Sequence, residues 1–204
     1  MFIRTDVSQG GEVEQLIERT VAEFGRLDYA LNNAASLGAP RSTGDFTEAE
    51  FDSEVNLNLK SVWLCMKYEI AQMLQQEPRG GAIVNTSSVN GLGGAASAAL
   101  YAMSKAGILA LTKSAAQEYA ARHIRVNSLV AGGFDTELLR SAVRERVGSD
   151  PAKKAEIFSK YASRIPLGRI GNPEEAAEAA FWLCSDAASY VTGHSMIVDG
   201  GLTA

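Results

Sequence analysis

The chain has 204 residues, of which 46% are hydrophobic and 21% charged. Its formal net charge of -5 argues against a protein that binds duplex nucleic acid, because such proteins need surplus Lys and Arg to neutralise phosphates. No apolar run reaches the roughly 20 residues of a membrane span, and the N-terminus lacks the basic and apolar regions of an export signal. The two cysteines have no metal-ligand spacing, which favours a reduced, cytoplasmic compartment.

Short strand-like segments alternate with longer helical ones, a pattern typical of an α/β fold with a parallel sheet. Residues 2–5 are expected to form the first strand. Apolar residues in segment 12–24 recur with the period of a helix, and Gly25 stands where a helix C-cap is expected. Thr47, with Glu50 three residues later, predicts the start of a long helix that runs to about residue 76.

The second half of the chain continues this alternation. Asn172 as N-cap and Pro173 in the first turn predict a helix that ends at Cys184. The polar segment 131–164 predicts a binding loop with helical structure at 138–147, and its part 133–164 is the expected substrate-binding lid. The remaining expected elements are strands at 27–31, 82–86, 124–130 and 195–198 and a long helix at 99–121.

Tyr101 and Lys105 stand four residues apart in the expected helix 99–121, so their side chains leave the same helix face one turn apart. A phenol with a reference pKa of about 10 is a poor acid or base at neutral pH. An ammonium group one turn away favours the phenolate and lowers that pKa. Such a pair can exchange a proton with a hydroxyl group, although the spacing alone also fits a solvated surface pair.

Ser88 follows the expected strand 82–86 at its carboxyl end, where open α/β sheets bind their ligands. In this setting the segments GAIVNTSS, ending at Ser88, and YAMSK, from Tyr101 to Lys105, resemble the serine, tyrosine and lysine motifs of the short-chain dehydrogenase/reductase family. The resemblance extends in the right order along the whole chain. Its other matching segments are Asn32-Asn33-Ala34-Ala35, Asn58-Leu59-Lys60-Ser61-Val62-Trp63, Ile124-Arg125-Val126-Asn127 and Asp199-Gly200-Gly201.

The resemblance implies roles for four residues. Tyr101 would be the general acid/base that exchanges a proton with the substrate oxygen, and Ser88 would hydrogen-bond that oxygen. Lys105 would lower the pKa of Tyr101 and hold the nicotinamide ribose. Asn58 would anchor a water that passes protons to solvent; Asn56 is the alternative, but the residues that follow Asn58 favour Asn58.

The resemblance also implies a cofactor, NAD or NADP, with NAD slightly preferred. Its expected binding residues are Asp6, Val7, Asn33, Ala34, Tyr101, Lys105, Gly132, Phe134 and Thr136. Asp6 and Val7 would contact the adenine, Phe134 the carboxamide, and Thr136 the phosphates. Two positions depart from the family pattern: Ala131 replaces a proline, which makes that turn more mobile, and Ala35 replaces a glycine, which matters only if its φ is positive.

The N-terminus departs most from the family, whose members begin with a strand, a glycine-rich turn and a helix that cradle the pyrophosphate. We therefore expect a single, N-terminally truncated, Rossmann-like doubly wound parallel sheet over residues 1–204, with the first two strands and about fifty residues absent. The possible origins are a start assigned at an internal methionine, which we prefer, a shortened product, or numbering that begins at an ordered part. An in-frame upstream extension containing Gly-x-x-x-Gly-x-Gly is the corresponding prediction.

The glycine-rich segment at Gly91 and the two histidines are not expected to bind a cofactor or a metal. The segment that starts at Gly91 fits a G-x-G-x-x-A pattern, but it lies between Ser88 and Tyr101 rather than directly between a strand and a helix, so we interpret it as a flexible active-site loop. His123 and His194 show no ligand spacing, and we expect no metal.

The predicted function is hydride transfer between a nicotinamide cofactor and a small secondary alcohol or ketone. The alternative is an inactive, cofactor-less fragment with only a structural, oligomerising role. We expect no nucleic-acid or membrane partner. We expect a homo-oligomer, a tetramer or a dimer, formed through the apolar helices around residues 57–74 and 101–119.

Overall fold

A computed structural model describes residues 1–204 and shows a four-stranded sheet in the order β1-β2-β3-β4, with every neighbouring pair parallel. The strands are β1 (Tyr29–Asn32), β2 (Gly81–Ser88), β3 (Ile124–Ala131) and β4 (Ser195–Val198). All four carboxyl ends therefore meet at one edge of the sheet, in line with the predicted α/β, Rossmann-like architecture.

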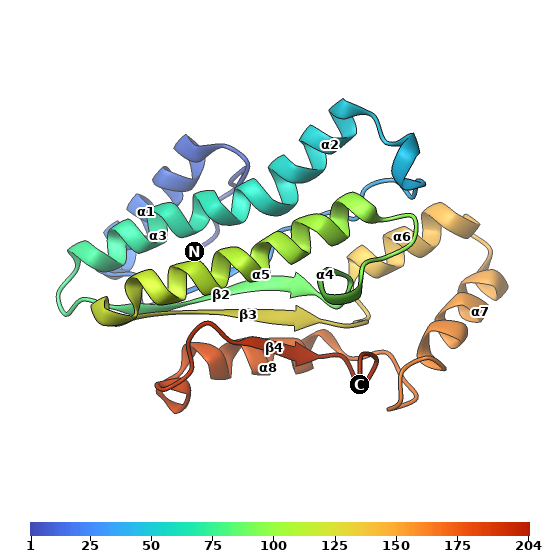
Figure 1. Ribbon diagram of the computed structural model, residues 1–204. Coiled ribbons are helices and arrows are strands. Elements are labelled where there is room, and N and C mark those ends of the chain that lie inside the picture. Colours follow the sequence, from blue (N-terminus) through green and yellow to red (C-terminus); the bar gives the residue numbers. More distant parts are fainter.

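Helices cover both faces of this sheet (Figure 1). On one face lie α1 (Gly10–Phe24), α3 (Ser61–Gln75) and α5 (Ala99–Tyr119), and on the other lies α8 (Pro173–Cys184). The shorter helices are α2 (Glu48–Val55), α4 (Asn90–Gly93), α6 (Glu137–Val147) and α7 (Pro151–Ala162), with single turns at Thr43–Asp45, Ala120–Arg122 and Asp186–Ala188. None of the helices combines the length and the apolar character needed to cross a bilayer.

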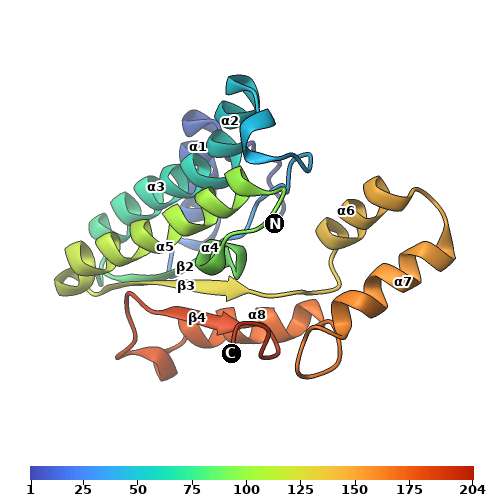
Figure 2. The ribbon, with the colours of Figure 1, turned by 45° about the vertical axis from the view of Figure 1, so that its right-hand side comes forward.

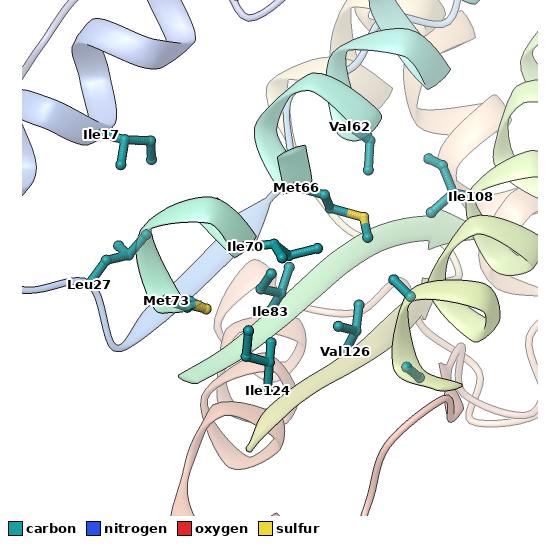
Figure 3. Packing of buried hydrophobic residues seen from close by; sticks show 12 residues of the cluster. Ile17, Leu27, Val62, Met66, Ile70, Met73, Ile83, Ile108, Ile124 and Val126 are labelled. Atoms are coloured by element: carbon teal, nitrogen blue, oxygen red, sulfur yellow. The ribbon is translucent and has the colours of Figure 1, made fainter. Parts of the chain in front are cut away.

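The core has a part on each face of the sheet because successive residues of a strand point to opposite sides. Ile83 of β2 packs with residues from α3 and α5 in the larger cluster, where Figure 3 shows it beside Met73. Val84, the next residue, packs instead with Leu183 of α8. β2 is thus buried on both faces, and this rigid central strand carries Ser88 at its end.

Several helices begin and end where local sequence signals predict. The Thr47 side chain accepts from the Glu50 N–H, and the Glu50 carboxylate accepts from the Thr47 N–H, which completes a capping box at the start of α2. Gly25 ends α1 with a left-handed φ of 83°, a conformation that costs glycine little. At α8, Glu175 accepts from the Asn172 N–H at 2.8 Å.

Two predicted elements were wrong, and a third was confirmed in part. Residues 2–5 form no strand, because no strand lies beside them to pair with their backbone groups. The long helix from Thr47 is interrupted by a π turn, Asn56–Lys60, between α2 and α3. Segment 133–164 is more helical than expected, since Pro151 and its N-cap Asp150 start α7 after α6. Figure 2 shows that α6 and α7 project beyond the carboxyl edge of the sheet.

Candidate active site

Four buried polar residues converge on the carboxyl edge of the sheet from three elements. Ser88 ends β2 and is 8% exposed, Tyr101 and Lys105 on α5 are 7% and 2% exposed, and Asn58 in the π turn is 0% exposed. The four catalytic residues expected from the sequence are thus all removed from bulk water, which excludes the solvated surface pair as an account of Tyr101 and Lys105.

Hydrogen bonds tie strand β2 to helix α5 next to this site. The Lys105 amino group donates to Thr86 O at 2.8 Å, and the Ser87 hydroxyl donates to Lys105 O at 2.7 Å. The Ser88 hydroxyl accepts from the Asn90 N–H at 3.2 Å, at the start of α4. Strand, short helix and long helix are therefore held in one arrangement around Tyr101.

Burial governs the titration of both α5 residues. Burial raises the pKa of Tyr101, and the nearby Tyr161 and Glu54 raise it further, while a hydrogen bond with Ser88 lowers it. Burial also lowers the pKa of Lys105 to about 8. The expected net lowering of the Tyr101 pKa was therefore wrong for this structure. The Lys105 amino group lies 5.6 Å from the centroid of the Tyr101 ring and is not among the groups that shift this pKa.

The π turn buries Asn58 and leaves Asn56 at its outer side. The Asn58 amide donates to Glu54 Oε2 at 2.7 Å, and its oxygen accepts from the Ser36 N–H at 2.9 Å. Asn56 instead accepts from Lys60 at the surface, at 3.0 Å. Of the two asparagines considered from the sequence, Asn58 is the one that lies inside the site.

Several expected cofactor residues share a groove along β1. Val7, Asn33 and Ala34 line a cavity of about 320 Å³ between α1, β1 and α3. Asp6 lies at the surface before α1, outside this lining, where its carboxylate accepts from the Ser8 N–H and hydroxyl. The structure thus brings three of these residues together and leaves Asp6 apart.

The other expected cofactor residues follow β3. Gly132 packs so tightly against the backbone of Asp199 that a Cβ would lie 2.5 Å from its Cα. Phe134 forms a parallel bridge with Gly171, and Thr136 accepts from the Leu139 N–H at 3.4 Å as the N-cap of α6. This segment joins the edge of the sheet to α6 and α7.

Two sequence details are decided by the backbone. Ala35 does not have a positive φ, so its replacement of a glycine imposes no strain. The segment interpreted as an active-site loop begins with the short helix α4, Asn90–Gly93, and only its second part, from Gly94 on, has no helical structure. A Cβ at Gly91 would lie 2.8 Å from the backbone carbon of Lys105, so α4 packs directly on α5.

Sequence reasoning missed two residues of the site. Glu54 stands one helical turn before Asn58, and the (i, i+4) spacing could have revealed it. Tyr161 lies on α7, where its ring occupies the space that a Cβ of Gly133 would need. No local signal links Tyr161 to Tyr101, because only the packing of α7 brings the two together.

A parallel α/β sheet that gathers a serine, a tyrosine, a lysine and an asparagine at the carboxyl ends of its strands defines a dinucleotide-dependent oxidoreductase. The family model described as enoyl-(acyl carrier protein) reductase matches residues 1–203. The chain belongs to the short-chain dehydrogenase/reductase family, and it is an oxidoreductase that acts on CH–OH groups.

Similar proteins agree with this assignment. The 2,5-dichloro-2,5-cyclohexadiene-1,4-diol dehydrogenase of Sphingobium indicum is 39% identical over 204 residues, which cover 100% of this chain and 78% of that protein. Ligand-free aldohexose dehydrogenase of Thermoplasma acidophilum superposes with a TM-score of 0.92 at 33% identity, over 98% of this chain and 77% of that chain. ElxO with NADP bound has a TM-score of 0.87 at 30% identity, over 99% and 77% of the two chains. None of these matches favours the inactive alternative.

Proposed function

We propose that the protein interconverts a small secondary alcohol and its ketone with Tyr101 as the general acid/base. The observation that carries this proposal is the convergence of Ser88, Tyr101, Lys105 and Asn58, all buried, on one edge of the sheet. In the direction of oxidation, Tyr101 accepts the proton of the substrate hydroxyl. In the direction of reduction, the same phenol returns a proton to the carbonyl oxygen.

The other three residues act around this proton. Ser88 donates a hydrogen bond to the substrate oxygen and orients it toward Tyr101. Lys105, whose pKa is about 8, is mostly protonated at neutral pH and stabilises negative charge on the phenol as it forms. Asn58 holds a water that connects the site to solvent.

The donors at the site suit a nicotinamide dinucleotide, NAD or NADP, which would supply the hydride chemistry. Lys105 donates one hydrogen bond, to Thr86 O, which leaves two N–H groups for ribose hydroxyls. Further residues proposed to hold the cofactor are Asp6, Val7, Asn33, Ala34, Tyr101, Gly132, Phe134 and Thr136. We prefer NAD to NADP, a choice that rests on the general likeness of the motifs to NAD-dependent members.

The proposed substrate is a hydroxylated ring compound, in keeping with the cyclohexadiene diol in the name of one similar protein. Residues 133–164 would act as a lid, since α7 brings Tyr161 to the neighbourhood of Tyr101. We further propose that the protein is cytoplasmic and forms a homo-oligomer.

The decisive experiment compares the protein with its Tyr101→Phe variant. Binding of NADH and NADPH is followed by fluorescence, and turnover is measured with a panel of cyclic secondary alcohols. Because the hydroxyl is the only proposed proton-transfer group, Tyr101→Phe should lower kcat by about 10²–10⁴-fold while the cofactor Kd stays within about twofold. If the variant keeps more than about a tenth of the wild-type kcat, Tyr101 is not the acid/base.

A further inference from the structure

Glu54 is an acidic side chain at the active site to which the mechanism above gives no role. It lies in the last turn of α2, and its Oε2 accepts from the Asn58 amide at 2.7 Å. The carboxyl group is half-buried, and this burial raises its pKa, while the bond with Asn58 lowers it. Hydrogen bonds that involve an ionised carboxylate are about twice as strong as neutral ones, so Glu54 is the stronger of the two partners that hold the Asn58 side chain.

The other carboxylate oxygen of Glu54 touches the loop that follows β1. A Cβ at Gly38 would overlap Glu54 Oε1, and Gly38 adopts a φ of 63°, which disfavours any other residue there. The same loop donates the Ser36 N–H to Asn58 Oδ1 at 2.9 Å. Glu54, Asn58 and the loop from Ser36 to Gly38 therefore form one closed set of contacts that fixes both ends of the Asn58 amide.

The charge of Glu54 also faces Tyr101. Three elements bring titratable groups to this phenol: Lys105 is on the same helix, Tyr161 comes from α7, and Glu54 comes from α2. A negative charge at Glu54 disfavours the phenolate and so raises the pKa of Tyr101. Glu54 is thus joined to the proposed acid/base by charge and to Asn58 by a hydrogen bond.

We propose that Glu54 is a positioning residue for the reaction: its carboxylate fixes the side-chain amide of Asn58 and holds the π turn beside Tyr101. The proposal rests on the roles assigned above to Asn58 and Tyr101. Glu54 thereby acts through Asn58 rather than on the substrate itself.

A double-mutant cycle tests this role in the full chain. Glu54→Val removes the acceptor and should lower kcat about tenfold with little change in the KM for alcohol or cofactor, because orientation is lost rather than binding. Glu54→Gln keeps an acceptor for the Asn58 amide and should recover most of that loss. If Glu54 acts through Asn58, adding Glu54→Val to Asn58→Ala should lower kcat no further.

The pH profile supplies a second measurement that a purely structural role would not change. Glu54→Gln removes the negative charge near Tyr101, so the rising limb of kcat for oxidation should move to lower pH. The expected shift is a few tenths of a unit, because Glu54 is only half-buried and solvent screens part of its charge. Asp52→Val, a similar change at an exposed position of α2, is the matched control and should alter neither kcat nor the profile.

The outcomes separate this proposal from the proposed function. If Tyr101→Phe and Asn58→Ala lose activity while Glu54→Val keeps the wild-type kcat, the role proposed for Glu54 is overturned. The proposed function is not affected by that result. Additive losses in the double variant would overturn the role of Glu54 too, since they would mean that Glu54 acts independently of Asn58. If Glu54→Val does not fold, a pH profile of Glu54→Gln that superposes on the wild type would have the same meaning. Full activity in Tyr101→Phe would instead overturn the proposed function.

Discussion

Lys105 is a lysine with 2% of its surface exposed, and its four-carbon stem passes through the packed contact between β2 and α5. Burial lowers its pKa to about 8, so the charge that the mechanism needs is retained at neutral pH but lost in mild alkali. The amino group donates one hydrogen bond, to Thr86 O of β2. In the proposed mechanism this amino group both stabilises charge on the phenol and binds the cofactor ribose.

Lys105→Met should therefore both weaken cofactor binding and lower kcat. The substitution keeps the apolar stem but removes the charge and the donors, so both the cofactor Kd and kcat should change by at least about tenfold. This distinguishes it from Tyr101→Phe, which should change kcat alone. Fluorescence titration and steady-state kinetics on the two variants check the contrast, and an unchanged cofactor Kd in Lys105→Met would contradict the proposed ribose contact.

Glu69 on α3 is a second buried ionisable residue, with 5% of its surface exposed and one hydrogen bond, from the Asn32 amide at 3.1 Å. Burial raises its pKa to about 7. A raised pKa means that the protonated form stabilises the fold; this contribution is complete below the unfolded-state pKa and is lost as the pH rises through about 7.

Glu69→Gln should weaken this pH dependence. Glutamine keeps an acceptor for Asn32 and never becomes charged, so the variant should gain free energy of unfolding over the wild type as the pH rises from 5 to 8. The rise in the pKa of Glu69 to about 7 corresponds to a gain in the free energy of unfolding of about 3 kcal/mol for the variant. Urea unfolding at the two pH values measures the difference, with the exposed Glu118→Gln as the control that should not change it. A constant difference between Glu69→Gln and the wild type would contradict the prediction.

At the scale of elements, the short helix α4 follows Ser88 in the chain and packs against α5, the helix that carries Tyr101. The contact between α4 and α5 depends on Gly91, where a Cβ would lie 2.8 Å from Lys105 C and 2.9 Å from Ala106 N. Backbone atoms cannot give way as a flexible side chain can, so any larger residue must push α4 away from α5. Such a shift would displace the strand end that carries Ser88.

Gly91→Ala should consequently destabilise the protein by about 1–3 kcal/mol and lower kcat. Gly93→Ala is the matched control in the same helix, because nothing lies within 4 Å of its Cβ and its φ is not positive. The control should be neutral or slightly stabilising. Thermal unfolding and kcat are measured for both variants; equal behaviour would show that the α4–α5 contact does not position Ser88.

At the scale of the whole molecule, large apolar side chains remain exposed on several helices. Trp63 on α3 is 46% exposed and Met103 on α5 is 41% exposed, and both belong to the helices expected to form an interface. Other exposed apolar residues are Phe181 and Trp182 on α8, Ile197 on β4 and Tyr190 in the segment between them. Apolar surface of this extent favours association between copies of the chain.

The protein should therefore sediment as a tetramer or dimer at micromolar concentration. Trp63→Asp places a charge in the proposed interface and should shift the population to smaller species, whereas Phe24→Asp, an exposed aromatic on α1, should leave it unchanged. Analytical ultracentrifugation of the three proteins checks this expectation. A wild-type protein that is only monomeric would refute it for this chain.

Sequence alone determined the features that depend on neighbours along the chain. The capping box of Thr47 and Glu50 and the glycine that ends α1 are local signals, and both marked the helix ends. The motif residues Ser88, Tyr101, Lys105 and Asn58 could be named because their spacing and surroundings resemble a known family. Each of these features is encoded within a few residues of where it acts.

Tertiary structure decided the features that depend on distant parts of the chain. Residues 2–5 have a strand-like sequence, yet a strand also needs a partner beside it. The direction of the Tyr101 pKa shift follows from burial and from Tyr161 and Glu54, which come from other helices. Pairing, burial and charge interactions act through space, so residues far apart in sequence had to be packed together before their effects could be assigned.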